Sequence, residues 1–112
     1  MGASKGDYKR IMIKIKIPKK LEISSFSYRV DTSDSTLADL EEKSFWGQCS
    51  DSSKTLKLRN DMSSDQLRAT LCHEIVEAII NDYEIELSHS DVSRIGVGIA
   101  QALKSMGVGF VV

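Results

Sequence analysis

One short segment of the sequence has the residue types and spacing of a metal-binding helix. His73 and Glu77 are four residues apart, so on an α-helix their side chains lie one above the other on the same face. Glu74 follows His73 directly and lies about 100° around the helix, on the flank of that face. Imidazole and carboxylate groups both ligate zinc, and a neighbouring carboxylate can accept a proton from water. The segment therefore predicts a metal site with a general base beside it.

A catalytic zinc site needs a third protein ligand and one open position. His89 is the candidate, because it is the only other histidine in the chain. It precedes a second helical pattern, and a helix that folds back antiparallel to the first would begin near Glu77. We therefore expect Zn²⁺ as the cofactor, with His73, Glu77 and His89 as ligands and Glu74 as the catalytic base. The alternative is a partly buried histidine beside ordinary surface glutamates, with no metal.

Several residues near this segment invite other interpretations. Cys72 is the direct neighbour of a predicted ligand and points about 100° away from it on a helix, so we expect a small buried residue. Cys49 is also interpreted as structural. Trp46, Gly47 and Gln48 are predicted to line a substrate groove. A lone tryptophan at the end of a strand can equally serve as core or rim packing.

Two helices are expected in the second half of the chain. Residues 64–82 carry apolar side chains at three- and four-residue spacing, and Ser63 is placed to cap their first turn. A second helical pattern runs from about residue 92 to 103, with Ser88 or Ser90 as its cap. The predicted ligands would then lie on the first helix and at the start of the second.

Alternating apolar residues predict strands before these helices. Residues 11–17 alternate isoleucine with lysine in their second half, and a β-type run covers residues 21–30. The alternation of that run slips near Ser24 and Ser25, which indicates a bulge or a break. Short β-type runs on either side of the polar residues 50–53 predict a hairpin.

Together these elements predict one α+β domain, in which a small antiparallel or mixed sheet with a hairpin packs against two helices. We place the domain at residues 11–107, after a flexible leader at residues 1–10. Residues 108–112 are apolar, and we assign them as a C-terminal tail, with a final strand as the alternative. The acidic residues 31–44 are expected to form a loop or a short helical turn.

The composition limits the classes of function. The chain has 112 residues, of which 28% are charged and 41% hydrophobic, as in an ordinary soluble domain. No apolar run approaches the roughly 18 residues of a membrane span, and the polar, basic start predicts no signal peptide. Two cysteines are too few for a disulfide scaffold, so we expect a cytoplasmic protein. The net charge of −1 argues against nucleic acid as a partner, and no membrane partner is expected.

The basic residues are nevertheless uneven. Seven of them fall within the first twenty positions. We interpret them as a solvated leader followed by the exposed face of an edge strand, where lysine blocks unwanted strand pairing. The alternative is a patch that binds an anionic partner.

The motif segment resembles the minimal zincin-like metalloproteases encoded in bacterial genomes and prophages. Those proteins carry H-E-x-x-H-A-[IL] on a helix after a small sheet and a hairpin. Residues 73–79 read HEIVEAI, and the specific likeness continues to the Leu-Ser-His at residues 87–89. The order of elements is similar over residues 21–106. Glu77 stands where the family usually has histidine, and a subset of phage-type proteins has the same HExxE form with a downstream histidine.

The resemblance implies a zinc-dependent metallopeptidase that hydrolyses peptide bonds with metal-activated water. It implies that His73 is a zinc ligand and Glu74 the general base, and we infer that a carboxylate on the first helix and a histidine after it have exchanged places. The substrate would be a peptide or protein, bound extended beside the hairpin edge at residues 45–49. The alternative is a catalytically inactive adaptor or accessory protein of phage or mobile-element origin, either metal-binding or metal-free.

Overall fold

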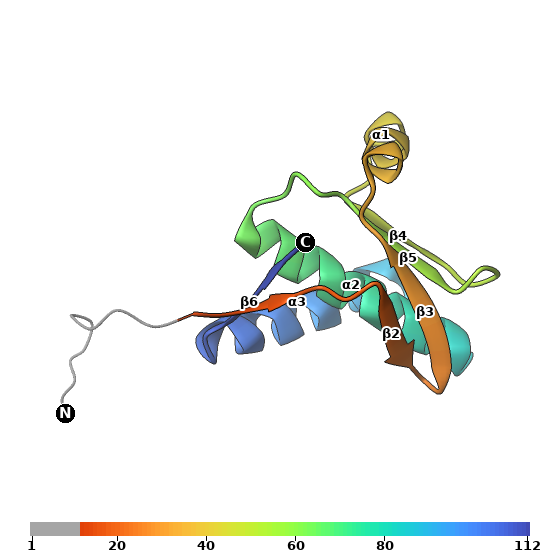
Figure 1. Ribbon diagram of the computed structural model, residues 1–112. Coiled ribbons are helices and arrows are strands. Elements are labelled where there is room, and N and C mark those ends of the chain that lie inside the picture. Colours follow the sequence, from red (N-terminus) through yellow and green to blue (C-terminus); the bar gives the residue numbers. More distant parts are fainter. Residues whose placement is uncertain (1–11) are drawn as a thin grey trace, which may run out of the picture.

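The computed structural model describes residues 12–112 and has an α+β architecture, as predicted (Figure 1). The expected leader at residues 1–10 lies outside the described residues. Within them, no helix combines the length and the apolar character needed to cross a membrane. The elements in chain order are β1 (Ile13–Lys16), β2 (Lys20–Ile23), β3 (Phe26–Asp31), α1 (Asp34–Lys43), β4 (Gly47–Ser50), β5 (Thr55–Leu58), α2 (Ser64–Asp82), α3 (His89–Ser105) and β6 (Val108–Val111).

The strands form two sheets. A four-stranded sheet has the order β2-β3-β5-β4, with antiparallel pairs at both ends and the parallel pair β3–β5 in the middle. A second sheet consists of β1 and β6 in parallel. Helix α2 packs against the larger sheet, against β6 and against α3, which makes it the central element of the fold (Figure 1).

The core lies between α2 and the two sheets. Three residues of the apolar stripe of α2 are buried in it, and Ile75 and Ile79 of the same stripe are partly buried against it. The buried members are Ile17, Ile23, Tyr28, Val30, Leu56, Leu58, Leu67, Leu71 and Ala78. Burying a large aliphatic side chain of this kind contributes roughly 1.5–3 kcal/mol. This apolar packing holds α2 firmly against the sheet, so the side chains on its other face have a fixed position.

Helix boundaries follow the capping residues. Helix α2 begins after Ser63, whose hydroxyl accepts a hydrogen bond from the backbone N–H of Gln66, as predicted. Of the two candidate caps for the next helix, Ser88 is the one used, and its hydroxyl accepts from the backbone N–H of Asp91. His89 is therefore the first residue of α3.

The acidic segment 31–44 contains a longer helix than the expected loop or short turn. Helix α1 has ten residues, with Ser33 as N-cap and Ser44 in the left-handed conformation at its C-terminal end, at φ 60°. Only Thr36 and Leu40 of α1 are buried. Two buried positions are too few to produce a clear helical period in the sequence, which explains the weak prediction.

Two alternatives left by the sequence are resolved by the strands. The run 21–30 is broken into β2 and β3 by Ser24 and Ser25, whose φ angles of 54° and 70° are those of a tight hairpin turn with left-handed residues. At the other end of the chain, the residues after Gly107 form the strand β6 and pair with β1. The folded domain therefore extends through β6.

A buried carboxylate joins the C-terminal end of α2 to the sheet. Asp82 accepts hydrogen bonds of 2.7 Å from the hydroxyl of Tyr28 and from Nζ of Lys54. The Asp82 side chain is 0% exposed, whereas Asp51, the second carboxylate bound to Lys54, lies at the surface. Burial favours neutral Asp82, but the hydrogen bonds from Lys54 and Tyr28 outweigh it and lower the pKa of Asp82 below its ordinary value.

We expect Asp82→Asn to destabilise the protein by about 1.5–3 kcal/mol at pH 7, because hydrogen bonds to a buried charge are lost. Since the pKa of Asp82 is lower in the folded state, its stabilisation is present above the unfolded value near 3.9 and disappears as the pH falls through the folded value. Urea unfolding should therefore show that the difference in free energy of unfolding between the parent and Asp82→Asn shrinks from pH 7 to pH 3. Asp51→Asn, at the surface, should cost less than about 1 kcal/mol; an equal loss would refute the role of Asp82.

Candidate metal centre

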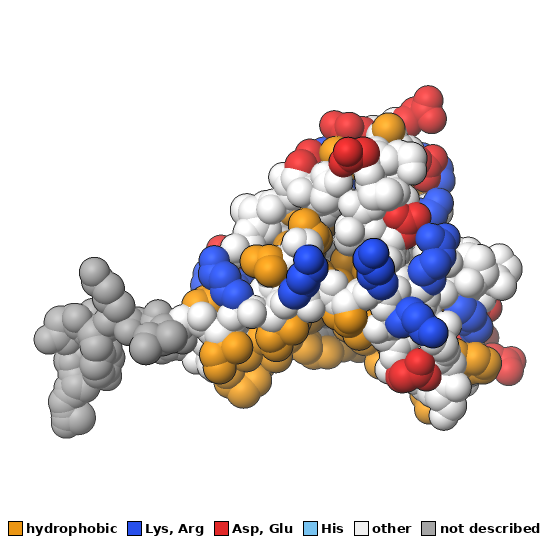
Figure 2. All heavy atoms as spheres, viewed as in Figure 1, with side chains coloured by type: hydrophobic (Ala, Val, Ile, Leu, Met, Phe, Trp, Pro, Cys, Tyr) orange, Lys and Arg blue, Asp and Glu red, His pale blue; other side chains and the backbone are white. Residues whose placement is uncertain are grey.

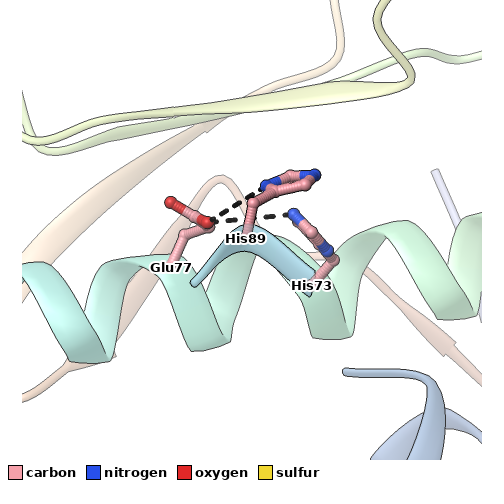
Figure 3. A group of neighbouring side chains, drawn as sticks. All are labelled: His73, Glu77 and His89. Carbon is pink, nitrogen blue, oxygen red and sulfur yellow. Dashed lines mark ion pairs between the residues drawn. The ribbon is translucent and has the colours of Figure 1, made fainter. Parts of the chain in front are cut away.

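The three predicted ligands converge at one point between α2 and the start of α3 (Figure 3). One donor atom from each of His73, Glu77 and His89 lies within 4.8 Å of the others. Oε1 of Glu77 is 3.9 Å from Nε2 of His73 and 4.0 Å from Nδ1 of His89. The imidazole rings meet edge to face, with centroids 5.1 Å apart and an interplanar angle of 62°. The structure thus brings residues from two helices into one cluster that could bind a metal ion.

The chemistry of this donor set fits a zinc ion. Two imidazole nitrogens and a carboxylate oxygen are a usual ligand set for hydrolytic zinc, and ligand atoms about 2.0–2.1 Å from a tetrahedral ion lie about 3.3–3.4 Å apart. The two separations from Glu77, 3.9 Å and 4.0 Å, exceed this by less than about 1 Å, and all three donor atoms lie within 4.8 Å of one another. The His89 side chain is 79% exposed and has room to rotate inward. Small side-chain movements would therefore close the set around an ion.

Close packing of α3 on α2 determines the position of His89. A Cβ atom added at Gly96 would lie 3.0 Å from Cα and 3.2 Å from N of His73, so the two helices touch at the residue that carries the first ligand. Gly98, two positions further along α3, faces open space, with nothing within 4 Å of an added Cβ. Glycine at position 96 lets α3 approach this closely, whereas an alanine there would require the two backbones to separate by a few tenths of an ångström.

These two glycines form a matched pair for a test. Both Gly96→Ala and Gly98→Ala gain helix propensity, worth about 1 kcal/mol, but only the first must push the helices apart. We expect Gly98→Ala to be neutral or stabilising and Gly96→Ala to be less stable than it by about 1–3 kcal/mol. Urea denaturation measures both. Equal stabilities of the two variants would show that the contact between position 96 and His73 does not determine how closely α3 approaches α2.

Glu74 lies buried beside this cluster, underneath β4. Glu74 is 6% exposed, and a Cβ added at Gly47 would lie 3.2 Å from its Cγ. Its carboxylate has no hydrogen-bond or ion-pair partner among residues 12–112. Burial, and secondly the charge of Glu77, raises the pKa of Glu74 to about 8. Glu74 is thus a carboxylate prepared to hold a proton near neutral pH.

The electrostatics of His73 also suit metal binding. Burial lowers the pKa of His73; the carboxylate of Glu77 opposes this shift and His89 adds to it. The neutral imidazole is therefore favoured at neutral pH, and the neutral form is the one that ligates metals.

The cluster opens into a cleft of about 470 Å³ between α2 and the β4 strand. Trp46, Gly47 and Gln48, the predicted groove residues, line this cleft together with the metal cluster and Glu74. Trp46 is half-exposed at the rim, where the guanidinium of Arg59 lies 4.8 Å from its ring centroid. Whether these three residues contact a substrate stays a prediction.

The cysteines are not part of the donor set. Cys72 is a buried residue of α2, as predicted. Cys49 is half-buried in the wall of the cleft, where burial, followed by the charges of Glu74 and Glu77, raises the pKa of Cys49 to about 12. A thiol in this state is a weak metal ligand and a weak nucleophile at neutral pH.

Sequence reasoning missed three features of the site. It did not anticipate that Glu74 would be buried, that Arg59 would stack on Trp46, or that two glycines would set the spacing of the site. Glycines in a strand or a helix are signs of close backbone approach. Gly47, predicted only as a groove residue, and Gly96 could have been assigned this role on that ground.

Comparisons with protein-family models, with curated proteins and with solved structures found no match to this chain. The functional conclusion therefore depends on the geometry and chemistry of the site.

Proposed function

We propose that this protein is a zinc-dependent hydrolase of the metallopeptidase type, which cleaves peptide bonds in an extended peptide or protein. The observation that supports the proposal best is the cluster of His73, Glu77 and His89 next to a buried carboxylate, Glu74, at the floor of an open cleft. A largely buried carboxylate with a raised pKa in the wall of a cleft is typical of functional sites.

Each residue of the site has a definite role in this proposal. His73 and Glu77 hold the ion from α2, and His89 completes the set from the start of α3. When bound, zinc would act as a Lewis acid and lower the pKa of water to near neutrality. Glu74, on the flank of the ligand face, would take a proton from the attacking water and pass it to the leaving amine. In the metal-free protein burial raises the pKa of Glu74, and the positive charge of a bound zinc ion would lower it again, which favours the ionised form that accepts the proton.

The edge of the larger sheet offers a place for the substrate. Strand β4 pairs only with β5 among the described residues, so its other edge is free beside the cleft. The backbone carbonyl of Trp46 accepts from the N–H of Arg59, which directly follows β5, so by alternation the N–H and C=O groups of Gly47 and Cys49 point to the free edge. An extended peptide could pair there as an additional strand, with its backbone close to Glu74.

Zinc content and activity together test this proposal. Protein purified without chelators is expected to contain about one zinc ion per chain and to unfold at a lower temperature after treatment with a chelator. Hydrolysis of a library of quenched fluorescent peptides should disappear with the metal and return when zinc is restored. Zinc binding without hydrolysis of any peptide would favour the metal-binding adaptor, and no zinc with no thermal shift would favour the metal-free adaptor.

We place this activity in a reducing compartment such as the cytoplasm. Cys49 and Cys72 are free thiols and form no disulfide with each other. A chain of this kind has no need of an oxidising environment.

A further inference from the structure

Four lysines at the start of the described chain have no ion-pair partner among residues 12–112. Within residues 12–112, every other lysine and arginine makes at least one ion pair: Arg29, Lys43, Lys54, Lys57, Arg59, Arg68, Arg94 and Lys104. Lys14, Lys16, Lys19 and Lys20 make none, and all four are exposed. Figure 2 shows basic side chains in a row over the face that carries β1 and β2. The positive charge of this segment is therefore unbalanced within the described protein.

The same segment also exposes apolar side chains. All four residues of β1 are exposed, including Ile13 at 60% and Ile15 at 44%. Side chains alternate along a strand, so the isoleucines lie on one face of β1 and Lys14 and Lys16 on the other. Strand β1 therefore presents exposed apolar side chains on one face and exposed lysines on the other.

Within residues 12–112, one edge of β1 has no paired strand. Its other edge pairs with β6, where the N–H groups of Ile13 and Ile17 donate to the carbonyls of Gly107 and Val111 at 2.6 Å and 2.8 Å. Backbone groups of alternate residues point to opposite edges of a strand, so those of Lys14 and Lys16 point away from β6. Among the described residues no strand pairs there, so the outward N–H and C=O groups of Lys14 and Lys16 have no strand partner in residues 12–112.

We propose that the free edge of β1 binds an extended segment of a partner protein in which acidic residues alternate with apolar ones. The segment pairs with the outward N–H and C=O groups of Lys14 and Lys16. Its carboxylates lie next to the two lysine side chains, and its apolar side chains cover Ile13 and Ile15 on the opposite face. One bound segment would thus pair with the lysine charges, cover the exposed isoleucines and form hydrogen bonds with the free backbone edge.

The lysines also exclude a second copy of this chain as the occupant. Pairing β1 with β1 of another molecule would place lysine next to lysine, and like charges on neighbouring strands are destabilising. Lysine on an edge strand therefore prevents self-association and at the same time selects an acidic strand. Nucleic acid or an anionic lipid surface would use the charge but would not require the alternation of isoleucine and lysine.

Synthetic peptides test the proposal directly. A short peptide of alternating glutamate and valine is compared with one of the same composition in which the glutamates are grouped at one end, and with one of alternating lysine and valine. We expect only the alternating acidic peptide to bind in fluorescence anisotropy and to shift the amide NMR signals of residues 13–17. Equal binding of the grouped peptide would overturn the proposal.

Charge reversal on β1 tests whether the acidic peptide binds next to Lys14 and Lys16. The double variant Lys14→Glu with Lys16→Glu should bind the acidic peptide at least about tenfold more weakly and should bind the lysine-valine peptide instead. The control, Lys19→Glu with Lys20→Glu, changes the net charge equally but lies outside β1 and should have a smaller effect. Equal losses in both variants, or tighter binding to duplex DNA or anionic vesicles than to the peptide, would refute strand pairing. The proposal does not depend on the metal site.

Discussion

His89→Ala is expected to lower the affinity of the protein for zinc by more than about a hundredfold without affecting its fold. His89 supplies one of three donors in the cluster, and its side chain is 79% exposed, so its removal leaves no cavity in the core. Competition with a chromogenic zinc chelator measures the affinity, and circular dichroism measures the fold. The large expected effect follows because the remaining His73 and Glu77 occupy only two positions of a tetrahedral ion.

Ser90→Ala is the matched control, because Ser90 is the exposed neighbour of His89 in α3 and is not the helix cap. It should leave the zinc affinity unchanged. Glu77→Ala is expected to weaken zinc binding as His89→Ala does, whereas Glu77→His should retain it, since imidazole replaces carboxylate as a ligand. If His89→Ala binds zinc as tightly as the parent, the third ligand has been assigned to the wrong residue.

The second large effect is expected from Glu74→Gln, which should keep zinc but reduce peptide hydrolysis by about 10²–10⁴-fold. Glutamine has nearly the same shape as glutamate, so the packing under Gly47 is preserved while the proton acceptor is lost. Zinc content and initial rates with the best peptide of the library are measured on the same preparations. Retained hydrolysis in Glu74→Gln would exclude Glu74 as the base.

The metal-free forms of the parent and of Glu74→Gln allow a check of the environment of Glu74 that does not depend on activity. Since burial raises the pKa of Glu74 from 4.5 to about 8, the folded state binds this proton more tightly than the unfolded state. The stability of the parent should therefore fall relative to Glu74→Gln as the pH rises from 4.5 towards 8. Urea unfolding in the presence of a chelator measures the difference. A difference that does not vary with pH would mean that Glu74 is better solvated than the structure indicates.

Local patterns in the sequence were sufficient to predict the central helix α2 and the relative position of His73 and Glu77 on it. The spacing of Leu67, Leu71 and Ala78 fixed the buried face of α2, and Ser63 fixed its beginning. The relation of His73 to Glu77 follows from the pitch of that helix alone. The α+β class also followed from the order of strand and helix patterns. These features depend on interactions between residues close in sequence, which a pattern records directly.

Other parts of the fold depend on contacts between distant segments. The pairing of β1 with β6 joins opposite ends of the chain, and the parallel pair β3–β5 is separated by α1 and β4. No local period encodes such partners. Helix α1 was underestimated because only Thr36 and Leu40 face the core, so its apolar repeat is too sparse to be recognised.

The sequence by itself thus determined which residues are suited to hold a metal and placed two of them on one helical face. Only the tertiary structure brought His89 to them, because its position depends on how closely α3 approaches α2 at Gly96. Only the tertiary structure gave Glu74 its raised pKa, because β4 must cover the helix at Gly47 to remove that carboxylate from water. Spacing along a helix is a property of the local backbone, whereas ligand convergence and desolvation arise from the packing of separate elements.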